Sequence, residues 1–167
     1  MASVYRELQP EQASYLGSTF PGYSKVNGTN FPVSGLYFDA AADEAAFWKL
    51  QALLYGSGNL TLDLEWYADS ATSGVVRWGG AIAAITPDTD SQDVETKAFA
   101  TETTVDDTHL GTTGQRLHRC TITISNLDSL AAGDVVWLRI RRIGSNGADT
   151  MTGDAILVKA TLSYSDT

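Results

Sequence analysis

Two carboxylates within residues 60–68 form a pattern that could support acid–base chemistry. Asp63 and Glu65 lie two positions apart in an alternating run, so both side chains emerge on one face if the run is a β-strand. Glycoside hydrolysis uses two carboxylates that flank the scissile bond, and β-sandwich glycosidases usually take one of them from a different strand. We therefore favour a simpler interpretation, in which both residues solvate the exposed face of their strand.

Histidine and cysteine offer a second kind of chemistry. His118 and Cys120 share one strand face, and His109 lies in a turn-like stretch. A cysteine–histidine nucleophile needs a third group that orients the base, and none is evident. We interpret these residues as core or edge positions and the lone cysteine as a buried thiol. Because the nucleophile-elbow, phosphate-loop and zinc-protease motifs are also missing from the sequence, it predicts no enzyme.

An acidic stretch resembles the beginning of a calcium loop. Asp88, Asp90 and Asp93 occupy the first, third and sixth positions of such a loop. The EF-hand pattern requires glycine at the sixth position and glutamate at the twelfth, where this chain has Phe99. We interpret the stretch as an acidic surface loop and expect neither a metal nor a cofactor.

Arginines and tryptophans are candidates for binding. Arg139, Arg141 and Arg142 form the only basic cluster, and the guanidinium fork suits a carboxylate of a neighbouring strand or one across a subunit interface. The other four candidates are aromatic rings on which a sugar could stack. The alternation of residues 60–68 puts Trp66 on the buried face of its strand. The sequence does not show whether Trp48, Trp78 and Trp137 are buried or exposed.

The elements that would position these residues are β-strands. From residue 33 onward apolar and polar residues alternate, and turn residues separate the runs. Residues 40–54 are rich in alanine and would also suit a helix, but their alternation favours a strand. The sequence therefore predicts an all-β fold, a jelly-roll sandwich of about eight antiparallel strands, with immunoglobulin-like or barrel windings as alternatives. The expected strands are residues 34–39, 44–54, 60–68, 74–85, 97–107, 116–125, 134–143 and 154–164.

Residues 1–32 have a different composition. They contain three of the four prolines and no clear period, and proline is excluded from central strands. We predict an extended N-terminal arm over residues 1–32, followed by the sandwich domain over residues 33–167. Because exposed rings forgo burial, the arm would dock through its aromatic side chains on another surface, or alternatively lie on its own domain. The aromatic residues are Tyr5, Tyr15, Phe20, Tyr23 and Phe31.

The charge of the chain excludes some partners. Its formal net charge is −9, which disfavours the phosphate contacts of a nucleic-acid binder. No apolar run is long enough for a transmembrane helix, and the first residues lack the apolar core of a secretory signal. The sequence therefore predicts a protein that folds in a cytoplasm and binds neither nucleic acid nor membrane.

Several motifs resemble those of jelly-roll structural proteins of tailed bacteriophages. They are residues 60–68 (Leu-Thr-Leu-Asp-Leu-Glu-Trp-Tyr-Ala), 72–78, 127–134, 138–142 and 149–155. The resemblance covers roughly residues 34–164, and its motifs mark turns and strands. It implies a virion protein on the capsid exterior, a homotrimer, and the major capsid protein as partner.

These observations lead to three functional hypotheses. The first is a capsid cement or decoration protein whose aromatic arm binds the major capsid subunits, with the sandwich bridging neighbours and the three arginines at a possible subunit interface. The second is a carbohydrate-binding receptor module of a head or tail fibre, for which Trp78 or Trp48 beside Asp63 or Glu65 would form the platform. The third, a glycan-degrading enzyme, would need a cleft with two carboxylates.

Overall fold

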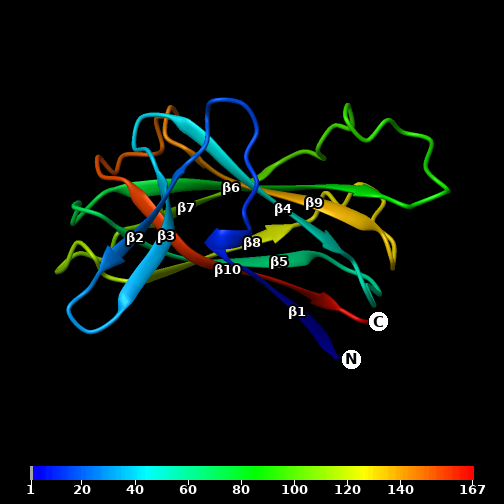
Figure 1. Cartoon of the computed structure of the whole chain (residues 1–167), viewed down its shortest axis with the longest axis horizontal. Helices are drawn as coiled ribbons and strands as arrows, with labels where there is room; N and C mark the ends of the chain where they lie inside the picture. Colours follow the sequence, from blue (N-terminus) through cyan, green and yellow to red (C-terminus); the bar gives the residue numbers. More distant parts are fainter. Residues whose placement is uncertain (1) are drawn as a thin grey trace.

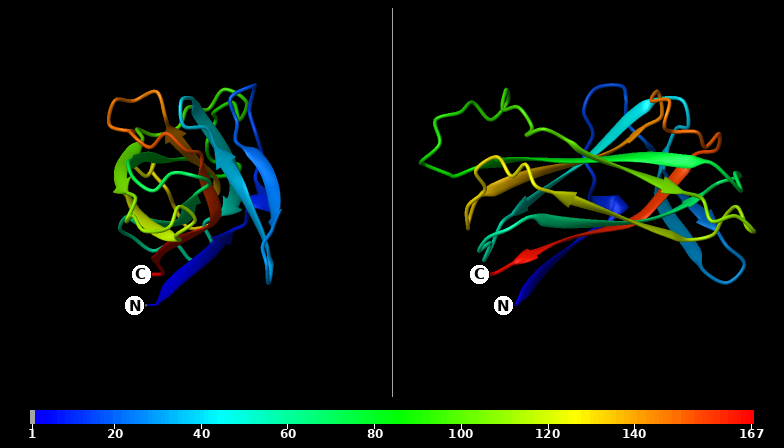
Figure 2. Two further views of the ribbon diagram at one scale, coloured as in Figure 1. Left: turned by 90° about the vertical axis from the view of Figure 1, so that its left-hand side faces the viewer. Right: turned by 180° about the vertical axis from the view of Figure 1, so that it is seen from behind.

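A computed structural model describes residues 2–167 of the chain. It contains ten β-strands and one short 3₁₀ turn, η1 (Pro10–Gln12). The strands form two antiparallel sheets that pack face to face (Figures 1 and 2). The predicted all-β sandwich is therefore confirmed. The described chain contains no helix of the length and apolarity that crossing a membrane requires.

Each sheet has a defined strand order. The larger sheet has the order β2 (Gly22–Asn27), β3 (Pro32–Phe38), β10 (Ala155–Ser165), β5 (Leu60–Ala68), β8 (His118–Ile124), and β1 (Ser3–Leu8) pairs with the second half of β10. The smaller sheet has the order β4 (Asp43–Gln51), β9 (Val135–Ile143), β6 (Val75–Ile85), β7 (Thr103–Thr108). Apart from the β6–β7 hairpin, every connection from β3 to β10 crosses between the sheets, which is the jelly-roll winding.

The eight strands from β3 to β10 correspond to the eight that the hydrophobic period predicts. The alanine-rich stretch forms strand β4, as the alternation favours. One boundary differs, because β7 begins at Thr103 and not near residue 97. The residues before it belong to a long loop between β6 and β7 (residues 86–102) that folds back over the smaller sheet.

Residues 1–32 do not form a separate arm, which corrects the predicted division of the chain. Residues 3–8 pair with β10 from Ser165 to Ala160, and β2 pairs with β3 along its whole length. The prolines that suggested an arm mark the ends of elements: Pro10 opens η1, Pro21 precedes β2 and Pro32 opens β3. The strands between them contain no proline and are free to pair.

The inner faces of the two sheets form one apolar core. At its centre the rings of Trp66 and Trp78 lie 6.2 Å apart in an edge-on arrangement, and Phe38 meets Trp78 at 5.2 Å. Such edge-to-face pairs are the favoured geometry of aromatic contacts. Because the inward positions alternate with outward ones along each strand, every core residue fixes the direction of its neighbours on the outer faces.

The two ends of the chain lie next to each other (Figure 1). The backbone N–H of Asp166 donates to the carbonyl of Ala2 at 3.2 Å, and the N–H of Ala2 donates to the Asp166 carboxylate at 2.9 Å. These bonds extend the β1–β10 ladder by one step beyond Ser3 and Ser165.

Candidate functional site

The outer face of the smaller sheet has a row of small residues. Gly79, Ala81 and Ala83 point outward along β6, and the register sets them beside Arg141, Arg139 and Trp137 of β9. The long side chains of β9 therefore project beside a strand whose outward side chains are very small. A cleft of about 340 Å³ opens over this face at the Ala83 end.

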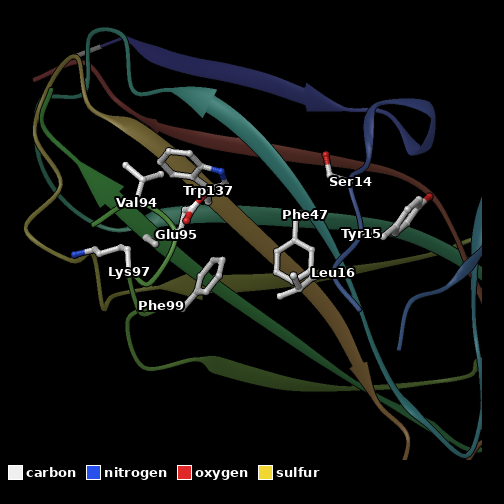
Figure 3. A pocket seen from close by; sticks show the side chains of 10 residues that line it. Ser14, Tyr15, Leu16, Phe47, Val94, Glu95, Lys97, Phe99 and Trp137 are labelled. Carbon is white, nitrogen blue, oxygen red and sulfur yellow. The ribbon is translucent and has the colours of Figure 1, made fainter. Parts of the chain in front are cut away.

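Aromatic rings line the cleft from several elements (Figure 3). Trp137 comes from β9 and Phe47 from β4, where they are diagonal neighbours, because Phe47 pairs with Arg139. Phe99 comes from the β6–β7 loop, and its ring centre is 5.9 Å from that of Phe47. Tyr15 lines the cleft from the segment that precedes β2. Three rings from three separate parts of the chain thus face one space, and Tyr15 lies at its rim with its ring turned outward (Figure 3).

The β6–β7 loop forms one wall of the cleft and is fastened at several points. The Lys97 ammonium lies 2.9 Å from the Asp128 carboxylate, and both side chains are largely buried. The N–H of Ala100 donates to the carbonyl of Ile82 at 2.9 Å, on the edge of β6 that β7 leaves free. These contacts hold Lys97 and Phe99 at the cleft although the loop has no regular structure.

Glu102 fastens the end of the same loop. Its carboxylate accepts two hydrogen bonds from Arg141 at 2.7 Å and one from Arg139 at 3.1 Å, and these bonds raise the pKa of Arg141 above its ordinary value. A Cβ on Gly79 would lie 2.6 Å from the Glu102 carboxyl carbon. The Arg139 guanidinium in turn lies 5.0 Å from the centre of the Phe99 ring, so Glu102 and Gly79 indirectly position an aromatic wall residue.

The opposite wall is formed by residues 13–20. Ser14 exchanges two backbone hydrogen bonds with Phe47, at 2.8 and 3.0 Å, and the carbonyl of Thr19 accepts one from Ala45. The segment therefore lies along the outer edge of β4. It carries Tyr15 and Phe20, whose ring centres are 5.2 Å apart.

The lining combines aromatic faces with a few polar groups. The polar lining side chains are Ser14, Glu95 and Lys97. Binding clefts of this composition use apolar faces for affinity and sparse polar groups for orientation. Glu95 is the one carboxylate among the described lining residues, so the cleft lacks the two opposed acids of glycoside hydrolysis.

The predicted carboxylate pair lies on the far side of the sandwich. Asp63 accepts a hydrogen bond from Thr121, and Glu65 lies between Arg119 and Lys159 on the outer face of the larger sheet. Hydrogen bonds from Arg119 and then from Lys159 lower the pKa of Glu65. Both acids are thus held in surface pairings away from the cleft.

The predicted tryptophan platforms are wrong. Trp48 is 3% exposed, and Trp66 and Trp78 are fully buried, so Trp78 and Trp48 cannot stack on a ligand beside Asp63 or Glu65. Trp137 is the partly exposed tryptophan, because it alternates with the buried Val136 and Leu138. This alternation was the sequence signal that could have selected Trp137.

The three arginines do not form one surface. Arg142 is fully buried between the sheets, since it is one step out of phase with Arg139 and Arg141 on β9. Its guanidinium makes five hydrogen bonds, two to Asp149 and three to carbonyl oxygens. Because Arg142 is buried, the prediction that it lies at a subunit interface is wrong. Arg139 and Arg141 instead donate hydrogen bonds to Glu102.

The five aromatic residues of the expected arm are exposed but scattered. Tyr15 and Phe20 stand beside the cleft, Tyr5 lies on β1, Tyr23 on β2, and Phe31 in the β2–β3 turn. Phe31 borders a second hollow, of about 610 Å³, on the larger sheet. The polar side chains there are occupied, because Gln115 donates to the carbonyl of Asp69 and Ser34 to Glu11. That hollow is larger than the cleft but offers almost only apolar contacts.

The two histidines form a buried pair that spacing alone did not reveal. Their ring centres lie 4.5 Å apart, and His118 stacks on Trp66 at the same separation. Burial and the nearby His109 lower the pKa of His118. Within residues 2–167 no three potential metal ligands come together, and Asp90 and Asp93 instead accept backbone hydrogen bonds in their own loop.

Comparisons with known proteins find similarity of fold. No protein-family model matches the sequence, and no curated protein matches it. A xylan-binding module, CBM15, has a TM-score of 0.52 at 12% identity, with 98% of each chain covered. A second carbohydrate-binding module, TmCBM27, whose specific recognition of mannan has been dissected, has a TM-score of 0.51 at 9% identity, with 99% of each chain covered.

These findings correct the expected family. The resemblance to tailed-phage structural proteins was wrong, because the similar solved structures are carbohydrate-binding modules. The predictions that depended on it, a capsid cement function, a major capsid protein as partner and a homotrimer, are wrong with it. What the chain shares with these two carbohydrate-binding modules is the β-sandwich fold.

Proposed function

We propose that this protein binds carbohydrate in the cleft on the outer face of its smaller sheet and that it catalyses no reaction. The observation that carries the proposal is the set of three aromatic rings, Trp137, Phe47 and Phe99, around one cleft with sparse polar groups. A sugar ring has an apolar C–H face and a rim of hydroxyls. It therefore matches a lining of aromatic faces and isolated hydrogen-bonding groups.

The walls support the proposal because they are fixed before a ligand arrives. Lys97, Ala100 and Glu102 fasten one wall, and Ser14 fastens the other by backbone pairing with Phe47. A cleft whose side chains are already ordered loses little conformational entropy on binding. The likeness in fold to a xylan-binding module and to a module that recognises mannan adds support.

Trp137 provides a direct test. The other three tryptophans are buried, so a change in tryptophan emission on addition of a glycan reports the cleft. We expect wild-type protein to be retarded in gels that contain xylan, galactomannan or mixed-linkage β-glucan, and its emission to shift with at least one of them. Trp137→Ala should lose both responses.

A matched control distinguishes binding in the cleft from non-specific adsorption to exposed aromatic side chains. Phe31→Ala removes an aromatic ring that is 69% exposed on the opposite sheet, and we expect it to bind like the wild type. If no polysaccharide retards the wild type, or if Trp137→Ala binds as well as Phe31→Ala, the proposal is wrong.

A further inference from the structure

The charges around the cleft are unequally neutralised. Lys97 lines the cleft, but its ammonium is paired with Asp128 at 2.9 Å. Glu95 lines the same cleft and takes part in no ion pair within residues 2–167. The uncompensated charge of the lining is therefore negative.

The nearest other cations do not change this balance. Arg139 and Arg141 are held by Glu102, and Arg141 also lies 3.7 Å from Asp43. Lys49 stands across from Trp137 on β4 and, like Glu95, is exposed to solvent, but it is not part of the lining.

We propose that Glu95 determines the charge class of the ligand, so that the cleft accepts uncharged polysaccharides and rejects those built from uronic acids. This inference rests on the proposed function. A free carboxylate accepts hydrogen bonds from sugar hydroxyls, and bonds to a charged acceptor are the stronger kind. The same carboxylate repels the carboxylate of a uronic acid that comes into direct contact with it, at a separation well below the Debye length. The net charge of −9 adds a weaker, long-range repulsion.

The test compares an acidic with a neutral polysaccharide. Wild-type protein, Glu95→Gln and Glu95→Lys are run by affinity electrophoresis and calorimetry against polygalacturonate and against the neutral polysaccharide that binds best. We expect wild-type protein to bind the neutral polymer only. The ratio of the affinity for polygalacturonate to that for the neutral polymer should rise by at least about tenfold in Glu95→Lys, with Glu95→Gln between the two.

A matched variant separates the local effect from net charge. Glu7→Lys makes the same change in net charge at an exposed position on β1 of the larger sheet, and we expect it to leave the ratio unchanged. Lys49→Gln tests the rim cation in the same way. Unfolding midpoints of all variants establish that each one is folded.

The outcomes distinguish the two proposals. If the wild type binds polygalacturonate as tightly as the neutral polymer, or if Glu7→Lys shifts the ratio as far as Glu95→Lys, carbohydrate binding stands and the role of Glu95 is refuted. If the wild type binds no polysaccharide of either kind, the proposed function itself fails and the role of Glu95 falls with it.

Discussion

The guanidinium of Arg142 and the carboxylate of Asp149 form a two-point ion pair inside the sandwich, with neither side chain exposed to solvent. Arg142 also donates to the carbonyls of Phe38, Met151 and Gly153. The pair thus ties the end of β9 to the β9–β10 loop and to β3 of the other sheet. All the remaining hydrogens of the guanidinium are occupied by carbonyls, as burial of a charge requires.

Removal of one partner of this pair should be costly. We expect Arg142→Met to lower the free energy of unfolding by about 3–5 kcal/mol, because it leaves the Asp149 charge buried without a partner. Urea denaturation measures the change. Arg119→Met, which removes an exposed partner of Glu65, is the control and should change the free energy of unfolding far less, because water screens the exposed pair. Equal losses in the two variants would contradict the interpretation.

The buried histidine pair predicts a loss of stability in mild acid. The Nε2 atom of His118 accepts a hydrogen bond from the N–H of Leu110, and burial lowers the pKa of His118 in the folded state. The unfolded chain, with a histidine pKa of about 6.5, therefore takes up the proton first. The contribution of His118 to stability is complete above that pKa, is lost as the pH falls toward the folded value, and changes no further below it.

The measurement is the difference between wild type and a variant that does not titrate. His118→Phe keeps a ring against Trp66 and removes the ionisable group. Glu44 and Asp154, whose pKa values burial raises, contribute equally to both proteins and cancel in the difference. We expect the stability advantage of the wild type to shrink between about pH 7 and 5. A difference that does not vary with pH would show that His118 does not titrate in this range.

Gly79 should control the cleft through Glu102. An alanine methyl at this position would meet the Glu102 carboxyl group at 2.6 Å, so the carboxylate must leave its present position beside Arg139 and Arg141. We expect Gly79→Ala to weaken carbohydrate binding severalfold, in gels or by the Trp137 emission response. Gly147→Ala, where an added Cβ meets nothing within 4 Å, should bind normally. Unchanged binding by Gly79→Ala would mean that the anchor of Glu102 does not position the wall.

The Cys120 thiol should report global unfolding. Burial in the core raises its pKa to about 12, so almost no thiolate is present at pH 8 and none is accessible. We expect a disulfide reagent to leave the native protein unmodified and to react at the rate of unfolding when urea is added. Rapid labelling of the native state would indicate local opening of β8.

The strands were predictable from the sequence, whereas the cleft was not. Alternation along one strand fixes which side chains face inward, and it locates β3 to β10 closely. The cleft depends on contacts between distant segments. Glu102 meets Arg139 and Arg141 across 37 and 39 positions, and Ser14 pairs with Phe47. A period of two carries no information about how such loops fold over a sheet.

The sequence misleads where neighbouring residues of one strand point to opposite faces of the sheet. Arg141 and Arg142 are one cluster in the sequence but point to opposite sides of β9. Likewise the prolines of residues 1–32 suggest that the whole segment is unable to pair in a sheet. They lie only at or beside the ends of strands and of η1, so the strands themselves can pair. In both cases the position of each single residue is informative, whereas the composition of the whole segment is misleading.

The pairing of β1 with the second half of β10 has a mechanical consequence. Because the two strands are antiparallel and both ends of the chain leave at the same end of the ladder, a load applied between the ends peels the strands apart. The hydrogen bonds then break one after another, beginning at Ala2 and Asp166, and no group of bonds shares the force. Under tension β1 would therefore separate first, while the β4–β9–β6 face that carries the cleft, in the other sheet, remains outside the line of force.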